Sequence, residues 1–429
     1  LPERYNTSGW VEEELASIEV LGTLRGMRLA RLSIAPVAYD PSGKKIRVYN
    51  NIELELIYKG ADSNKSRQIK AATYSPWFDI ISEQVFHAAG SKDVFEQHPD
   101  LTKYPVGMLV VSHPDFRETL QPFLEWQTQK GFRLHAAYTD EIGNTAEEIK
   151  AFIKDIYESA TAEAPAPTFL VLVGDSDKLP ASAIGSSSNH VTDLYYASVD
   201  GDYFPDMYYG RLSARNNQEL QHQIDKILYY QQYLFEDPTY LNEVTLIAGW
   251  DATWNPRIGQ PTLHYGIDNY FNEANGFSSV NAYFDSYTGC YEDDRISVSL
   301  INFTAHCNTT LWSSPNFTVN DVHALTNEGQ YPLAIGNCCM SGQFSVAESI
   351  AEAWLRAEKK GAVAYIGSAP NTYWFEDFYW SVGAWPIQGN NESGHVPTFE
   401  ESTLGAYDAP FITDYVAVDA MKFVGNLAV

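Results

Sequence analysis

The residues best suited to chemistry in this chain are a histidine and a cysteine that each follow a short apolar run. His306 comes directly after LINFTA, and Cys339 comes after LAIGN and a second cysteine, Cys338. Such runs are typical of buried strands, so both side chains are expected at the carboxyl ends of strands. A thiolate beside an imidazole base is a nucleophile for acyl transfer. The pair therefore predicts nucleophilic catalysis, with Cys339 as nucleophile and His306 as its proton-transfer partner.

Three further backbone and side-chain groups belong to this hypothesis. An oxyanion needs backbone N–H donors, and those of Cys339 and of Cys307, the residue after the histidine, are the natural ones. Asp251 ends another apolar run, VTLIAGWD, and ligands gather at the carboxyl ends of strands in open α/β sheets. On pattern alone, a satisfied polar histidine and a small buried cysteine fit the same positions.

The segments that carry these residues alternate between strand and helix patterns. From residue 107 to 175, apolar runs of strand length are separated by two helical patterns, of which one stops at Gly131 and the other opens with the capping-box pair Thr145 and Glu148. A second alternating unit starts near Val244. This alternation predicts an α/β fold with mainly parallel sheets covered by helices on both faces.

The N-terminal part of the chain has a different pattern. Residues 20–58 consist of short β-prone runs separated by the turn signal DPSG, which predicts an all-β unit. Residues 60–92 lose that pattern and are polar and turn-rich, as in a linker or a cleavable connection. The main domain boundary is expected near Lys92.

Bulk properties limit the possible functions. The 429 residues exceed one ordinary core, and two or three domains are expected. A formal net charge of -27 disfavours nucleic acid and anionic lipid as partners. Four cysteines do not make a disulfide framework, and no apolar run is long enough to span a membrane. Leu1 is not followed by a signal-peptide pattern, so any signal peptide is expected to have been removed.

Several motifs in a fixed order resemble the gingipain family of cysteine peptidases, and most of all its lysine-specific member. They are FTAHCNTTLW, HALTNEGQYPLAIGNCCMSGQF, GAVAYIGSAPNTYWFEDFYWSVGA, YTDE, LVGD, VDGDYFPD, IAGWD and GQPT. The likeness runs from about Asp93 to the end of the chain. It implies a caspase-like α/β fold with subdomains at 93–240 and 241–429, preceded by a β-rich propeptide at 1–92. It aligns Cys339, not Cys338, with the nucleophile and Asp251 with the carboxylate that orients the histidine.

The resemblance also implies a pocket for a basic side chain. Asp377 is expected at its base, where burial strengthens the attraction to an ammonium group. Trp374 and Trp254 are expected to flank the methylene stem, and Thr304 and Asn337 to line the same pocket. Without the resemblance, the tryptophans fit ordinary core packing, and Asp377 fits a solvated or helix-capping acid.

Two observations bear on specificity and on activity. Arginine-specific relatives carry their selecting acid where this chain has Thr262, which favours lysine, although one pocket acid can admit both basic side chains. The family normally shows glycine where this chain has Cys307, so a glycine-specific conformation is in question and a disulfide between Cys307 and Cys339 is conceivable. Arginine or mixed basic specificity, and an inactive binding homologue, therefore stay as alternatives.

VDGDYFPD is a candidate structural calcium site. Asp200, Asp202 and Asp206 are closely spaced acids in a turn-rich loop, with the Phe204 carbonyl between them, and calcium prefers such oxygen ligands. The resemblance adds Asp175 from LVGD. The alternative is a solvated turn.

SKDVFEQHPDL resembles the junction at which the family's mature enzyme begins. We therefore expect a zymogen that cleaves itself between Lys92 and Asp93, the alternative being a permanent accessory domain joined by a linker. The expected partners are protein and peptide substrates and the chain's own propeptide. The protein is expected to be a monomer that is secreted or held at a bacterial cell surface, with no organic cofactor.

Overall fold

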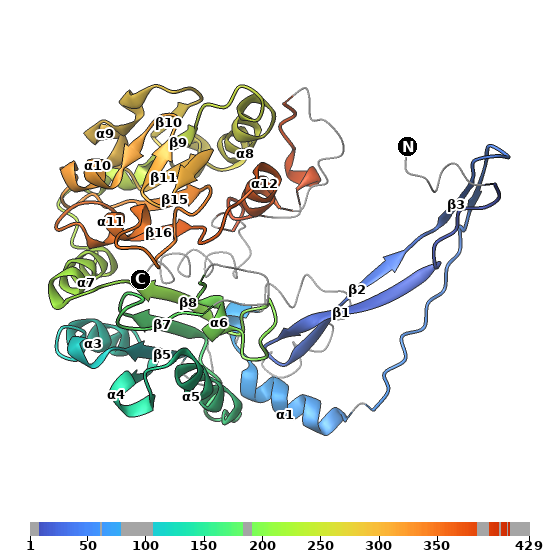
Figure 1. Cartoon of the computed structure of the whole chain (residues 1–429), viewed down its shortest axis with the longest axis horizontal. Coiled ribbons are helices and arrows are strands. Elements are labelled where there is room, and N and C mark those ends of the chain that lie inside the picture. The colour runs from blue at the N-terminus through green and yellow to red at the C-terminus, as the bar shows by residue number, and fades with distance from the viewer. Residues whose placement is uncertain are drawn as a thin grey trace.

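Two parallel β-sheets form the body of the protein (Figure 1). The computed structural model describes residues 8–60, 62–78, 106–182, 191–383, 394–402, 405–409 and 411. The strands of the first sheet are β5 (Gly107–Ser112), β6 (Arg133–Tyr138), β7 (Phe169–Val173) and β8 (Tyr208–Leu212), in the order β6-β5-β7-β8. Those of the second are β9 (Glu243–Ala248), β10 (Ser279–Tyr283), β11 (Leu300–Thr304), β15 (Leu333–Asn337) and β16 (Ala364–Gly367), in the order β10-β9-β11-β15-β16. The predicted α/β class is confirmed.

The first sheet is covered by helices on both faces because alternate strand residues point to opposite sides. Met108 and Val110 of β5 belong to one apolar cluster, and Leu109 and Val111 belong to another. The helices are α3 (Gln121–Gln129) and α7 (Asn217–Gln231) over the first cluster, and α5 (Ala146–Glu158) and α6 (Leu194–Ala197) over the second. The capping box predicted at the start of α5 is present.

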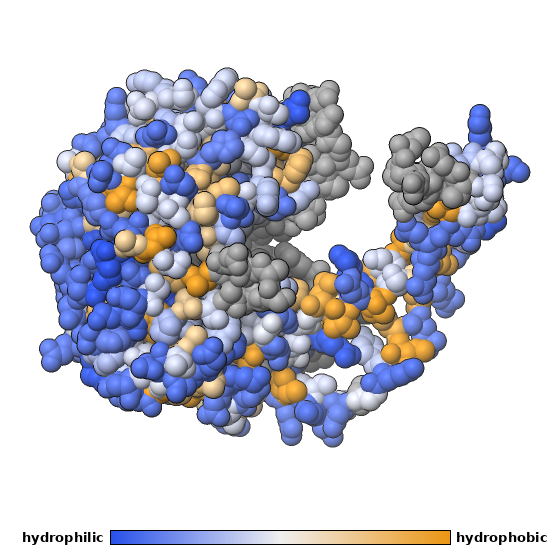
Figure 2. Space-filling model, in the orientation of Figure 1, coloured by the Kyte–Doolittle hydropathy of each residue, from blue (hydrophilic) through white to orange (hydrophobic). Residues whose placement is uncertain are grey.

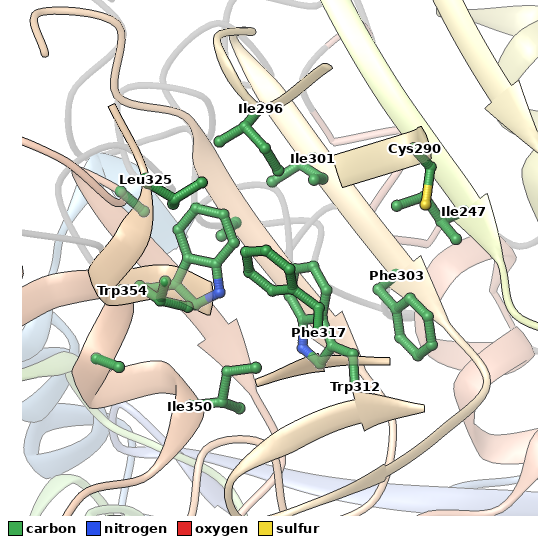
Figure 3. Packing of buried hydrophobic residues seen from close by; sticks show 14 of the residues in the cluster. Ile247, Cys290, Ile296, Ile301, Phe303, Trp312, Phe317, Leu325, Ile350 and Trp354 are labelled. Atoms are coloured by element: carbon green, nitrogen blue, oxygen red, sulfur yellow. The ribbon is translucent and has the colours of Figure 1, made fainter. Parts of the chain in front are cut away.

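The second sheet has the same layered arrangement. The helices are α10 (Val319–Ala324) and α11 (Ile350–Arg356) on one face, and α8 (Gln260–Asn269) and α12 (Trp374–Val382) on the other. Figure 3 shows the first of these cores, in which the rings of Trp312, Phe317 and Trp354 pack together. All three side chains are almost completely buried, so Trp312 and Phe317 anchor the segment that follows β11 to the core.

A small antiparallel sheet projects from the carboxyl end of β11. Its strands are β12 (His306–Asn308), β13 (Leu311–Ser313) and β14 (Phe317–Thr318), in that order. The remaining short helices are α4 (Thr139–Ile142), α9 (Asp293–Ile296), a π-helical turn at Asn255–Gly259, and 3-10 turns at Pro76–Phe78, Pro114–Phe116, Pro238–Asn242, Glu273–Asn275, Thr288–Tyr291 and Phe399–Glu401. Because β12 pairs only with β13, it is an edge strand of three residues.

The N-terminal unit is less regular than the sequence predicts. It contains two antiparallel ribbons and a helix, namely β1 (Ala16–Leu24), β2 (Met27–Ile34), β3 (Val37–Asp40), β4 (Lys45–Val48) and α1 (Ser63–Thr73). The predicted strand pattern at 51–58 forms no ladder, because no other described strand lies beside it. The predicted linker after residue 60 is wrong in part, since Asp62 caps α1. Apolar side chains of β1 and β2 stay exposed along the ribbon (Figure 2).

Arg25, at the turn between β1 and β2, anchors this unit to the first sheet. Its guanidinium group is buried and donates hydrogen bonds to the carbonyl oxygens of Thr73, Pro167 and Asp206. Its backbone N–H donates to a carboxylate oxygen of Asp206 at 2.7 Å. Burial lowers the pKa of Arg25, although nearby acidic groups oppose this. The N-terminal unit is therefore held by Arg25 and by residues 72–78, which also contact the first sheet, while the ribbon extends away from the body (Figure 1).

Candidate active site

The register of the second sheet brings the predicted histidine and cysteine to one edge. Strands β11 and β15 are parallel neighbours, and their last paired residues are Thr304 and Asn337. His306 and Cys339 each lie two residues beyond this pair. Strand β9 lies on the other side of β11, and Asp251 lies three residues beyond its end. All three residues thus lie at the carboxyl edge of the second sheet, where ligands gather in parallel sheets.

A short hydrogen bond joins the histidine to the predicted orienting carboxylate. The distance from His306 Nε2 to Asp251 Oδ2 is 2.9 Å, while 53% of the histidine side chain is exposed to solvent. Backbone N–H groups of Thr253 and Trp254 donate to Oδ1 of the same carboxylate. Burial raises the pKa of Asp251, but these hydrogen bonds outweigh it and the net pKa is lowered. Asp251 therefore stays ionised and fixes the histidine ring through Nε2, which leaves Nδ1 for proton exchange.

Cys339 is a half-buried free thiol. It stands just after β15 and before Met340, whose positive φ of 53° turns the chain. Its Sγ donates a hydrogen bond to the Thr372 carbonyl oxygen at 3.3 Å. The backbone N–H of Met340 donates to Pro370 of the same loop, so residues 370–372 hold the turn that presents the thiol.

The neighbouring cysteine has a different role. Cys338 forms a disulfide with Cys307, with a Cα–Cα distance of 5.4 Å. The idea of a disulfide between Cys307 and Cys339 is therefore wrong, because the buried Cys338 side chain faces β12. Cys307 lies in strand β12, where the backbone is extended and needs no glycine. The roles of the Cys307 and Cys339 amides as oxyanion donors stay predictions.

The predicted selecting acid is buried near the thiol. Asp377 lies in the first turn of α12 and is 4% exposed. Burial raises the pKa of Asp377 to about 7. Among the residues that the structure describes, no lysine, arginine or histidine forms an ion pair with Asp377. The carboxyl group is thus a buried acid without a cation, next to the Thr372 segment that contacts Cys339.

Of the other predicted pocket residues, Trp374 is the first residue of α12, and Asn337 and Trp254 contact that helix. The Asn337 side chain donates to the Asp377 carbonyl oxygen and to Ser381 Oγ, each at 3.0 Å, and so ties β15 to α12. The Trp374 ring packs edge-on against the His306 ring at 5.6 Å. The Trp254 ring packs against Phe375. Thr304 is buried and accepts a hydrogen bond from Asn302.

Thr262, at the position that carries the selecting acid in arginine-specific relatives, has a purely structural environment. It is buried in α8 and donates to the Ile258 carbonyl oxygen at 2.7 Å. No second acid therefore enters the site from this helix position.

The structure does not gather the predicted calcium ligands. Asp175 is paired with Arg356 of α11 at 2.9 Å. Asp202 accepts hydrogen bonds from the backbone of Thr23 and Phe204, and Asp206 accepts from Arg25 and Val199. No group of three or more histidine, cysteine, aspartate or glutamate side chains in the described residues is arranged to hold a metal ion. Asp202 and Asp206 of the loop thus make other contacts. Calcium binding stays a prediction that this arrangement does not favour, with the proposed ligands Asp175, Asp200, Asp202, Phe204 and Asp206.

Two features of the site were missed from the sequence. The Thr372 carbonyl oxygen contacts the thiol, and no motif marks it. The Cys307–Cys338 bridge was missed because two adjacent cysteines offered equivalent partners. The predicted processing site, Lys92 and Asp93, lies outside the described residues.

Comparisons with known proteins agree with this geometry. A family model described as peptidase family C25 matches residues 101–401. The chain is 46% identical over 99% of its length to Lys-gingipain W83 of Porphyromonas gingivalis, and 26% identical over 92% to Gingipain R2 of that species. It spans 24% and 53% of those two proteins, respectively.

Solved structures give the same family. One titled "Structure of Protease" is 46% identical, with a TM-score of 0.69 over 78% of this chain and 74% of that chain. Another, a complex of Porphyromonas gingivalis RgpB pro- and mature domains, is 25% identical, with a TM-score of 0.58 over 64% of this chain and 66% of that chain. The resemblance to the gingipains seen in the sequence is thus confirmed, and the chain belongs to peptidase family C25.

Proposed function

We propose that this protein is a cysteine endopeptidase that cleaves peptide bonds after lysine. The observation that carries the proposal is the placement of three groups at one sheet edge. They are the free thiol of Cys339, the His306 ring held by Asp251 at 2.9 Å, and the buried carboxyl group of Asp377. The similarity to Lys-gingipain W83 supports lysine as the preferred residue.

Catalysis starts with proton transfer from the Cys339 thiol to His306 Nδ1. The thiol gives up its hydrogen bond to the Thr372 carbonyl oxygen, and the thiolate attacks the carbonyl carbon of the peptide bond. The negative charge that develops on the carbonyl oxygen requires backbone N–H donors, for which the amides of Cys307 and Cys339 are proposed.

The histidine then returns its proton to the leaving amine. Asp251, whose pKa is lowered by its hydrogen bonds despite partial burial, stays negative and stabilises the imidazolium in the meantime. A water molecule, deprotonated by His306, hydrolyses the thioester and releases Cys339. Each step uses only groups at the end of the second sheet.

Specificity is proposed to come from Asp377. A lysine ammonium that reaches this buried carboxylate completes an ion pair in a site of low polarity, where the attraction is strong. Before substrate arrives, burial without a cation disfavours the ionised form of Asp377 and raises its pKa. Binding of the lysine ammonium removes this unfavourable state. Trp374 and Trp254 are proposed to contact the methylene stem of the lysine.

We propose further that residues 1–92 are a propeptide that stays bound after cleavage at Lys92. The buried Arg25 anchor supports this, because it holds the unit through contacts that do not depend on the connecting segment. The solved complex of RgpB pro- and mature domains supports the proposal, because in that relative a pro-domain is bound to the mature domain. No described helix is both long and apolar enough to cross a membrane. Secretion, or attachment to the cell surface, is proposed from the family.

Matched peptide substrates test the proposal. Three peptides that differ only in having lysine, arginine or alanine before the scissile bond are each incubated with the wild type and with His306→Ala, and the rate of hydrolysis is measured. We expect cleavage after lysine alone, and a loss of roughly 10³-fold or more in kcat for His306→Ala. His323→Ala is the matched control, since His323 forms a similar ion pair with Glu348 outside the site. Equal cleavage after arginine would contradict the specificity, and wild-type activity in His306→Ala would contradict the mechanism.

A further inference from the structure

The disulfide between Cys307 and Cys338 joins the immediate neighbours of the two central active-site residues. Cys307 follows His306, and Cys338 precedes Cys339. The bridged residues are 31 positions apart in sequence. The other two cysteines, Cys290 and Cys339, are free. The only bridge in the described part of the chain is thus placed between the nucleophile and its proton-transfer partner.

The two ends of the bridge differ greatly in how firmly they are held. Cys338 is completely buried in the core around Phe303 and Trp312, and its N–H donates to the Gly336 carbonyl oxygen. Cys307 is only half-buried in β12, an edge strand of three residues. A short edge strand is weakly held by its backbone pairing alone. The bridge therefore fastens a short edge strand to the buried end of β15.

His306 depends on this attachment more than its partners do. Its side chain is 53% exposed, and besides the Asp251 hydrogen bond it packs edge-on against the Trp374 ring. Cys339 is fixed by the turn at Met340 and by the Thr372 segment. A displacement of β12 would consequently move the imidazole while leaving the thiol in place.

We propose that the Cys307–Cys338 disulfide is a positioning cross-link that holds His306 at its working distance from Cys339, so that reduction of the bridge slows turnover. The inference rests on the proposed peptidase function. In the reduction, a dithiol transfers two electrons and two protons to the bridge, giving two thiols and a cyclic disulfide. Attack starts at the sulfur of Cys307, because Cys338 is inaccessible.

The proposal gives the enzyme two opposite thiol requirements. Cys339 must be reduced for catalysis, whereas its neighbour must stay oxidised. Activity in increasing dithiothreitol should therefore rise while oxidised Cys339 is recovered, and then fall as the bridge opens. The fall should follow the appearance of Cys307 and Cys338 thiols, measured by alkylation and mass spectrometry of the same samples.

The wild-type titration is one test, and a bridge-free variant is the other. In Cys307→Ala/Cys338→Ala we expect kcat for a lysyl peptide to fall roughly tenfold with KM little changed, because geometry and not substrate binding is lost. The rate of Cys339 alkylation by iodoacetamide should also fall toward that of His306→Ala, because a displaced imidazole no longer accepts the thiol proton. The matched control is Cys290→Ala, which removes a buried free thiol and should keep the wild-type values.

Three results would overturn the proposal. They are free thiols at Cys307 and Cys338 in non-reduced protein, undiminished kcat after the bridge has been opened in the wild type, and an unchanged rate of Cys339 alkylation in the bridge-free variant. Bridge mapping and alkylation need no peptide turnover. Failure of the proposed peptidase function would therefore be seen separately, as absence of cleavage in a protein whose bridge and alkylation behave as expected. If the double variant does not fold, the dithiothreitol titration of wild-type activity decides between these outcomes.

Discussion

At the scale of single residues, the site combines one carboxyl group that stays ionised with one that gains and loses its proton near neutral pH. Asp251 accepts three hydrogen bonds, which outweigh its partial burial and lower its pKa. Asp377 is buried without a cation, and its pKa is raised to about 7. The first therefore serves as a constant negative charge, while the second changes charge in the neutral pH range.

The titration of Asp377 predicts how lysine recognition depends on pH. Since the carboxyl group is neutral below pH 7 and ionised above it, a primary amine such as n-butylamine should inhibit roughly tenfold more weakly at pH 6 than at pH 8. Inhibition constants measured against a lysyl peptide between these values check this. Asp377→Asn should bind the amine weakly at every pH. Glu376→Gln, one exposed position earlier, should keep the pH dependence but move its midpoint to lower pH, because the Glu376 charge helps to raise the pKa of Asp377. A pH dependence that survives in Asp377→Asn would place the selecting acid elsewhere.

The hydrogen bond between Asp251 and His306 predicts a large effect on turnover. Asp251→Asn keeps the size of the side chain but removes the charge that stabilises the imidazolium, so kcat should fall roughly 10²- to 10⁴-fold at little cost in KM. Steady-state kinetics on a lysyl peptide measure this. Asp285→Asn is the control, because Asp285 caps a turn in the same subdomain. A fall in kcat of less than about threefold in Asp251→Asn would show that the carboxylate does not act through the histidine.

At the scale of elements, a buried charge network connects the two sheets. Arg356 of α11 contacts Asp175 and Ser213, which follow strands of the first sheet, and Glu352 of its own helix. Removing the arginine leaves two buried carboxylates without their cation. Arg356→Met should therefore lower the free energy of unfolding by about 3–5 kcal/mol.

Urea unfolding of Arg356→Met measures this prediction, with Arg215→Met as its control. Arg215 forms an i,i+4 ion pair with Glu219 but is 39% exposed, so its loss should cost no more than about 1 kcal/mol. Equal destabilisation by the two substitutions would contradict a special role for the Arg356 network.

The elements that carry the site were predictable, but their long-range partners were not. Apolar runs identified β9, β11 and β15, and neighbouring parallel strands end at the same edge of a sheet, so the strand-end positions of His306, Cys339 and Asp251 were predictable. Their assignment as proton-transfer partner, nucleophile and orienting carboxylate came from the resemblance to the gingipains. The Arg356–Asp175 pair joins residues 181 positions apart, and only the packing of α11 decides it. Likewise, the choice of Cys338 over Cys339 as the partner of Cys307 depends on which side chain faces β12.

At the scale of the whole molecule, the N-terminal unit is attached through Arg25. Arg25→Ala removes the donors to three carbonyl oxygens of the body, those of Ala166, Pro167 and Asp206, so the unit should loosen. We expect faster amide hydrogen exchange in β1, β2 and α1 of the full chain, and earlier loss of the N-terminal fragment on size-exclusion chromatography after processing. Arg31→Ala is the control, since Arg31 forms an exposed ion pair with Glu19 in the same ribbon. Unchanged exchange and retention in Arg25→Ala would show that other contacts hold the unit.

Covalent labelling of the whole protein tests the central claim most directly. A peptidyl ketone with a terminal lysine and a thiol-reactive group is incubated with the wild type, and the modified residue is located by mass spectrometry. We predict one label per chain, on Cys339, which is lost in Cys339→Ala and is suppressed by lysyl but not by arginyl peptides. Labelling of Cys290 or Cys307 instead, or no labelling at all, would contradict the assignment of Cys339 as the nucleophile of a lysine-specific peptidase.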